Sequence, residues 1–440
     1  MNNYEFLFYY FRDMPYYFGA LLIVFTIYIL LFKRFYYSVL DPMVISFVGS
    51  ALACTIVVFL YIDKVINDYY FFSFFFSQCA FLFCFLFFGK RNVNQERIRN
   101  SRMYNDNIHL NFSIFIISSF VFVVSQLIVY VTAGIPLFMD SRLETFVGGS
   151  GFGIFSRILD VSGFVSLFMI FNLYNSDKKL SNLRKKLLYF ICVFFVIAAV
   201  LSGSKSYFLL IGQTYFTYAV TSDSNLKINK IFKSVKKYEL KIVLLGLIVA
   251  MIVIKVQSSA ANSFSDALTM FGYRLIGFGD VFWYAYPNGT IERMVYIDKQ
   301  FNPFFALFSD FLGMFRLIPW DELPNAIGLD LYNMHHKTSA IIGPNARQNV
   351  FGYIYFGYSG SIVFSAIIGI VTGLCRKYFF QQNAANIYKK IFIALLYIKI
   401  FTLEYDPLLG LTYLNSMFIF LPIIFFLSKI YYDHLLSHLS

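Results

Sequence analysis

The sequence predicts an all-α, polytopic membrane protein with about 11 (11–12) transmembrane helices and one large extracytoplasmic segment between the eighth and ninth. Three observations support this fold class. The composition is 59% hydrophobic and 21% aromatic, which is far too apolar for a soluble protein of 440 residues. Apolar stretches of about 17–25 residues, long enough to cross a hydrocarbon layer, recur along the chain. Basic residues cluster between these stretches.

Eleven apolar stretches are candidate spans, although a few of them are shorter than about 17 residues. They are 16–33, 42–62, 69–89, 111–133, 155–174, 187–201, 205–220, 240–256, 350–374, 390–403 and 410–430. The turn-forming residues 202–204, Ser-Gly-Ser, separate the two short stretches 187–201 and 205–220. The alternative for these two is one long tilted helix.

The placement of Lys and Arg predicts the orientation. Most of the 36 basic residues fall in clusters at 33–34, 90–102, 178–186, 227–241 and 376–390. If the eleven spans alternate, all these clusters lie on one side, which the positive-inside rule identifies as cytoplasmic. The N-terminus is then outside and the C-terminus inside. The net charge of +12 therefore reflects topology, and no nucleic-acid partner is expected.

We expect one integrated membrane domain in three parts. Residues 1–256 carry helices 1–8 and a glycine-rich outer loop at 134–157, and residues 350–440 carry helices 9–11. Residues 257–349 form the large extracytoplasmic (periplasmic) segment, which is too long to be a simple connector. Its apolar stretch 301–320 is interrupted by charges and prolines, a pattern typical of an interfacial helix.

Basic residues on the predicted outer side are candidates for binding an anionic ligand. Arginine offers a planar fork of donors suited to phosphate oxygens. The candidates at helix ends are Arg142, Arg157, Lys205, Arg274 and Arg347. The alternative for each is a pair with a nearby carboxylate, or a side chain that reaches the lipid headgroups.

Two lysines have specific alternatives. Lys205 in "LSGSKSYFLL" lies at the start of a predicted helix, where free backbone N–H groups attract anions. It can equally be the lysine of a tight hairpin that reaches headgroups. Lys399, near the outer end of its span, either pairs with Glu404 or contacts a phosphate.

His335 and His336 are candidate general bases because imidazole titrates near neutral pH. On a helix they diverge by roughly 100°, so at most one points at a given site. The alternative is a pair of surface histidines without a role. Rival bases are the carboxylates Glu144, Asp266, Asp280, Asp330 and Glu404.

No cofactor or metal is expected. The five cysteines lie in or beside apolar segments, where they are packing residues, and no third His or Cys accompanies His335 and His336 at a ligand spacing. Motifs for phosphate loops, zinc hydrolases, serine hydrolases and metal-dependent nucleotide-sugar sites are absent. A lipid-linked donor, already activated by its pyrophosphate, therefore fits better than a nucleotide donor.

Several motifs resemble those of bacterial O-antigen or oligosaccharide repeat-unit polymerases, often called Wzy-type. They are "DPMVI" at the second span, "GIPLF" followed by an Arg and a glycine cluster, "SGSKS", where relatives usually show Gly-Ser-Arg, and "GPNARQNVFGYIYFGYSGSIVFSAIIGIVTG". The resemblance covers most of the length. Lysine in place of arginine is a departure that loses the bidentate fork.

The resemblance implies a glycosyltransferase of the bacterial inner membrane that joins undecaprenyl-pyrophosphate-linked oligosaccharides at the periplasmic face. A sugar hydroxyl of one unit attacks the anomeric carbon of the growing chain and releases undecaprenyl pyrophosphate. By this resemblance Lys205, with Arg142, Arg274 and Arg347, would bind the pyrophosphate, and His335 or His336 would accept the proton. Expected partners are the lipid-linked donor and acceptor, membrane lipid and a protein that regulates chain length.

Two other functions remain alternatives. A ligase that moves finished polysaccharide from the same carrier uses the same chemistry. A transporter of lipid-linked glycan would need a polar path through the bundle, and the sequence shows few ionisable groups away from the span ends and no paired broken helices.

Overall fold

The computed structural model describes residues 1–90, 107–139, 153–176, 180–203, 205–222, 264–298, 303–319, 322–336, 343–381 and 386–437, with isolated helical positions between 237 and 251. Within these ranges all regular structure is helical and there is no strand. Seven of the described helices are long and apolar enough to cross a membrane. The chain is therefore an all-helical polytopic membrane protein. The count of eleven spans and the extracytoplasmic segment stay predictions.

The chain divides into two compact units, which we describe separately. Unit 1 comprises Met1–Arg91, Ala260–Tyr378 and Lys399–Thr412. Its elements are α1 (Asn3–Arg12), α2 (Met14–Phe32), α3 (Pro42–Ile62), α4 (Asp68–Phe88), α12 (Phe264–Ile276), η2 (Gly277–Gly279), α13 (Asp280–Ala285), η3 (Pro287–Gly289), α14 (Thr290–Asp298), α15 (Pro303–Met314), α16 (Ile327–His335), most of α17 (Gln348–Gln381) and α19 (Thr402–Tyr405).

Unit 2 comprises Asn92–Ser259, Phe379–Ile398 and Tyr413–Ser440. Its elements are α6 (Ile108–Thr132), η1 (Pro136–Phe138), α7 (Gly153–Asn175), α8 (Asn182–Leu201), α9 (Lys205–Thr221), most of α18 (Ile387–Ile400) and most of α20 (Pro407–Ser437). In its core Phe122 stacks on Phe195 with ring centroids 4.6 Å apart, and Ser119 of α6 shares a 2.7 Å hydrogen bond with Ser166 of α7.

The helix ends follow local sequence. Asn67 and Asn107 each cap a following helix by accepting a backbone N–H two or three residues inside it. Asp41 caps α3 in the same way, and Pro42 occupies the first helical position. Between α8 and α9 the backbone of Gly203 has a φ of +57°, a conformation that ends a helix. The prediction of two helices here, instead of one long helix, is confirmed.

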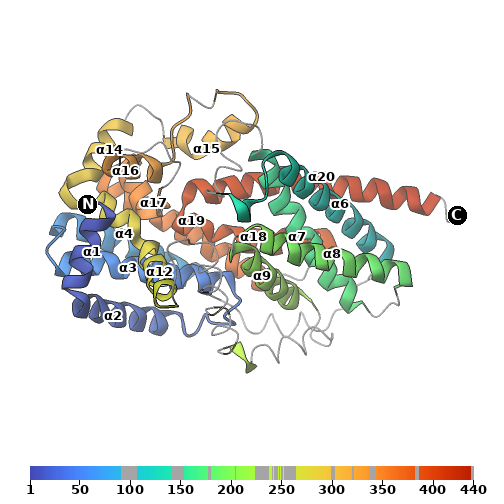
Figure 1. The fold of residues 1–440 in the computed structure, drawn as a ribbon, viewed down its shortest axis with the longest axis horizontal. Helices are drawn as coiled ribbons and strands as arrows, with labels where there is room; N and C mark the ends of the chain where they lie inside the picture. Colours follow the sequence, from blue (N-terminus) through green and yellow to red (C-terminus); the bar gives the residue numbers. More distant parts are fainter. Residues whose placement is uncertain are drawn as a thin grey trace. The chain divides into compact units, whose positions relative to one another are not determined.

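In unit 1, helices α2, α3 and α4 pack side by side (Figure 1). The apolar helix α17 folds sharply within itself. Gly357 has a φ of +70°, and Phe351 before it stacks on Phe364 after it at 5.2 Å. The first limb, from Gln348 to residue 356, therefore lies against the start of the second. A residue with a side chain rarely adopts this φ, so glycine permits the turn.

The first limb of α17 extends along α4. Asn349 contacts Ser77 and Gln78 at the middle of α4, whereas Tyr353 contacts Tyr69 in the first turn of α4. The first limb therefore begins beside the middle of α4, an apolar helix long enough to span a membrane, and it ends beside the first turn of α4. Residues 343–347, which lead into it, are not helical.

A second short element, the 3-10 turn η2 between α12 and α13, packs on α3. The 3-10 turn η2 packs so closely that a Cβ atom added at Gly279 would lie 2.6 Å from Ile56 and 3.1 Å from Ala53, near the middle of α3. Two stretches of the segment predicted to lie outside the membrane thus pack against the middle of long apolar helices.

Replacing Gly279 by alanine is expected to destabilise unit 1 by about 1–3 kcal/mol, the usual cost of overpacking a core. The matched control is Gly277→Ala in the same turn, where an added Cβ meets nothing within 4 Å. Melting curves of the detergent-solubilised variants measure the difference. Equal melting temperatures for the two variants would show that η2 does not pack closely on α3.

Candidate active site

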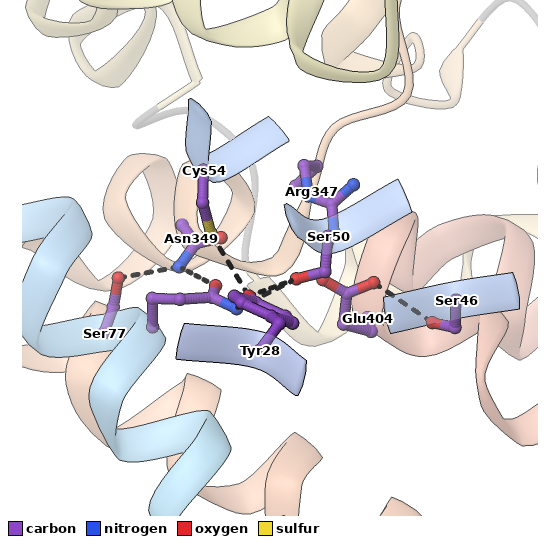
Figure 2. Close-up of polar contacts among 9 residues, drawn as sticks. Tyr28, Ser46, Ser50, Cys54, Ser77, Arg347, Asn349 and Glu404 are labelled. Atoms are coloured by element: carbon purple, nitrogen blue, oxygen red, sulfur yellow. Dashed lines mark hydrogen bonds and ion pairs between the residues drawn. The ribbon is translucent and has the colours of Figure 1, made fainter. Parts of the chain in front are cut away.

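A buried ion pair lies inside unit 1. The guanidinium of Arg347 pairs with the carboxylate of Glu404, and the hydroxyl of Ser46 on α3 donates to the same carboxylate at 3.3 Å (Figure 2). Arg347 is 3% exposed and Glu404 is fully buried. Both charges are therefore held away from solvent within an apolar bundle.

Short interruptions in the helices place the two charges. Arg347 is the last non-helical residue before α17, and its carbonyl accepts the N–H of Phe351 in the first turn. Glu404 lies in the single-turn helix α19, which packs on α3. The N–H of Asp406 closes this turn by donating to the carbonyl of Thr402, and its carboxylate accepts the N–H of Leu409 in the first turn of α20, which begins at Pro407.

A buried ion pair is weak evidence of stabilisation. Removing two charges from water costs several kcal/mol per ion, and apolar residues of similar volume are often as good or better. Ionisable residues inside membrane helices are instead expected to be functional by default. A second buried pair, Arg376 with Asp41, has a structural role, because Asp41 caps α3 and Arg376 donates to the carbonyl of Phe35. The pair of Arg347 and Glu404 has no such role in capping a helix, and it marks the candidate active site.

Asp280 is a second carboxylate on which the charge of Arg347 acts. It begins α13, outside the seven candidate spans, and its own carboxylate accepts the backbone N–H of Val281 at 2.9 Å. Burial raises the pKa of Asp280 from 3.8 to about 7, a shift that the backbone N–H groups and the charge of Arg347 partly oppose. A carboxyl group with this pKa can take up or release a proton near neutral pH.

A chain of neutral polar groups extends from the start of α17 into the helices. Asn349 Nδ2 donates to Ser77 Oγ at 2.8 Å and to Gln78 Oε1 at 3.2 Å. Gln78 Nε2 in turn donates to Ser50 Oγ at 3.0 Å and to Tyr28 Oη at 3.1 Å (Figure 2). These side chains belong to α2, α3, α4 and α17, so the network connects four helices of unit 1.

The two candidate histidines lie at the end of α16. His335 Nε2 is 2.9 Å from the carbonyl oxygen of Tyr284, and its Nδ1 is 3.5 Å from the amino nitrogen of Met1. Burial lowers the pKa of His335. His336 stacks on Tyr332 at 4.4 Å, and its Nε2 is 3.4 Å from the hydroxyl of Tyr284. Both rings are half-buried and packed on the aromatic ring of Tyr284, and their catalytic role stays a prediction.

The other predicted residues are distributed as follows. In unit 1, Arg274 is exposed on the last turn of α12, and Lys399 is buried on α18. In unit 2, Arg157 is half-buried on α7, and Lys205 begins α9 with a side chain outside the described part. Arg142 and Glu144 lie outside the described residues. Of the rival bases, Asp330 bonds Asn325 at 3.0 Å, and the side chain of Asp266 is not among those described.

The amides Gln78, Gln348 and Asn349 were not predicted from the sequence. A glutamine inside the Phe-rich stretch of α4 is a signal that could have directed attention to this helix, because polar groups there need a partner. The ion pair is predictable from the sequence only in part. The alternatives for Arg347 are a pyrophosphate or a nearby carboxylate, whereas Glu404 is either a partner of Lys399 or a rival base.

Taken together, the fold and the cluster define an integral membrane protein with a buried ionisable centre. Among the described residues no group of three or more His, Cys, Asp or Glu side chains is placed to hold a metal ion. No protein-family model, no curated protein and no solved structure matches the chain.

Proposed function

We propose that the chain polymerises undecaprenyl-pyrophosphate-linked oligosaccharide repeat units at the outer face of the bacterial cytoplasmic membrane. One observation carries the proposal beyond the sequence resemblance. A buried arginine pairs with Glu404, and its charge also acts on the carboxylate of Asp280, whose pKa is about 7. Glycosyl transfer from a pyrophosphate needs a cation for the leaving group and a base for the hydroxyl proton.

The proposed reaction assigns a role to each group. The hydroxyl oxygen of the acceptor sugar forms a bond to the anomeric carbon of the donor, while the bond from that carbon to the phosphate oxygen breaks. The electron pair leaves with undecaprenyl pyrophosphate, whose growing negative charge Arg347 stabilises. The hydroxyl proton passes to Asp280. Glu404 is a positioning residue, since it fixes the guanidinium of Arg347 through their ion pair.

Deleting the gene in its own host and then restoring it tests the proposal. Surface polysaccharide is resolved on a gel by repeat number. Loss of all bands above a single repeat unit on the lipid, reversed by restoration, is the expected result. An unchanged ladder would overturn the proposal, and polymer accumulating on its carrier would identify a ligase.

A transporter of lipid-linked glycan is the second candidate. It is favoured by the non-helical residues 343–347, because irregular backbone at membrane depth occurs where it is buried in protein or lines a polar cavity. In the deletion strain this function would be recognised by loss of all repeat units from the surface. The lipid-linked units would accumulate on the cytoplasmic side.

A further inference from the structure

Two adjacent amide side chains at the start of α17 have polar atoms with no hydrogen-bond partner in the part of the chain that the structure describes. Gln348 is fully buried, and neither its Oε1 nor its Nε2 has a hydrogen-bond partner among the described residues. The Oδ1 atom of Asn349, a residue that is 1% exposed, is equally without a partner there. Buried polar atoms are nearly always satisfied, and three together need an explanation.

The hydrogen-bond network fixes the orientation of the Asn349 amide. The hydroxyl of Ser77 donates its proton to the carbonyl of Phe74 at 2.8 Å, so it can only accept from Asn349. Gln78 presents Oε1, because its Nε2 already donates to Ser50 and Tyr28. Only the Nδ2 group of Asn349 satisfies both neighbours, and Oδ1 must therefore point away from them.

The free atoms indicate the chemistry of a ligand. A phosphate group only accepts hydrogen bonds, and it would be repelled by two unpaired carbonyl oxygens. A hydroxyl group both donates and accepts, which matches the free Oε1 and Nε2 of Gln348 and the free Oδ1 of Asn349. The amides lie directly after Arg347, whose charge the proposed function assigns to the pyrophosphate.

We infer that the Gln348 amide binds a hydroxyl-bearing neutral group, the sugar ring that adjoins the pyrophosphate of the substrate. The inference rests on the proposed function, and it makes Gln348 a determinant of sugar specificity. A site that hydrogen-bonds a substrate hydroxyl rejects analogues lacking it, because its own polar groups are then left unpaired. The alternative occupant of the site is a buried structural water molecule, which also donates and accepts hydrogen bonds.

Gln348→Met tests this assignment because methionine has nearly the same shape without polar atoms. We expect the variant to reach the membrane, to melt at the same or a higher temperature than the wild type when purified, and to form at least about tenfold less polymer in the restored deletion strain. The matched control is Gln126→Met on α6. Gln126 is also buried, with an Oε1 atom that lacks a partner among the described residues, and its variant should keep the polymer.

Other outcomes overturn the inference. Wild-type polymer from Gln348→Met would show that the amide contacts no substrate. A lower melting temperature, with polymer reduced only as far as folded protein is lost, would identify a structural water. If the Met variant is absent from the membrane, Gln348→Leu repeats the test, and absence of both would assign the amide to folding. If even the wild-type gene fails to restore polymer, the proposed function fails and the sugar assignment with it.

Discussion

Replacing Arg347 by methionine should abolish polymer formation and also destabilise the protein. The variant leaves Glu404 as a fully buried carboxylate without its cation, which typically costs about 3–5 kcal/mol. A double variant, Arg347→Met with Glu404→Met, removes both charges and should recover most of the stability, because apolar pairs replace buried ion pairs well. It should not recover polymer, since no cation remains for the leaving group. Melting curves and glycan ladders separate the two effects.

A second buried ion pair of unit 1 provides the control. Arg376 Nη1 lies 3.1 Å from Asp41 Oδ2, and both side chains are as buried as the first pair. The variant Arg376→Met with Asp41→Asn removes this pair and retains a side-chain oxygen to cap α3. Polymer should then remain in proportion to the folded protein. Normal polymer from the Arg347 and Glu404 double variant would contradict the assigned role of Arg347.

The second large effect is expected for Asp280→Asn, which should eliminate polymer while leaving the protein folded. Amide and carboxyl groups have the same shape, but the amide cannot accept a proton. In the wild type, the base is active only when it is ionised, so the rate of polymer formation should rise with pH through about 7 and then level off. The rate is measured with purified protein in liposomes between pH 5 and 9.

The same variant should change the pH dependence of stability. The folded-state pKa of Asp280 is raised, so its contribution to stability is fully present below the unfolded value of 3.8 and is lost as pH rises through about 7. Asparagine does not titrate, so the Asp280→Asn protein does not lose this stability as pH rises. Its free energy of unfolding should therefore increase relative to that of the wild type between about pH 4 and pH 7. An active variant with an unchanged pH profile would remove Asp280 from the mechanism.

Much of the helical architecture is predictable from the sequence because it follows from apolar length. The predicted ranges 42–62 and 205–220 agree with α3 and α9 to within a residue, since a capping residue or a glycine turn ends each helix locally. The fold of α17 at Gly357 was not predictable in this way. The stretch from residue 350 to 374 is continuously apolar, and only its packing partners decide whether the glycine adopts a positive φ.

The candidate site was predictable only in its residue types. The sequence singles out basic and acidic residues near helix ends, and Arg347, Asp280 and Glu404 of the candidate site are among them. Their partners were not predictable, because residues 347 and 404 meet through the packing of distant segments, whereas Lys399 is nearer to Glu404 in the chain. The amides Gln348 and Asn349 were missed because only burial distinguishes them from ordinary loop residues.

Glycosyl transfer by this chain is tested most directly with the purified protein in liposomes, supplied with undecaprenyl-pyrophosphate-linked repeat units and with EDTA, which removes divalent metal ions. We expect lipid-linked products containing two, three and more repeat units, with one undecaprenyl pyrophosphate released for each new bond. The Arg347→Met protein should form no such products. Repeat units that remain single, whether they stay in one leaflet or cross the bilayer, would contradict the assignment of glycosyl transfer to this chain.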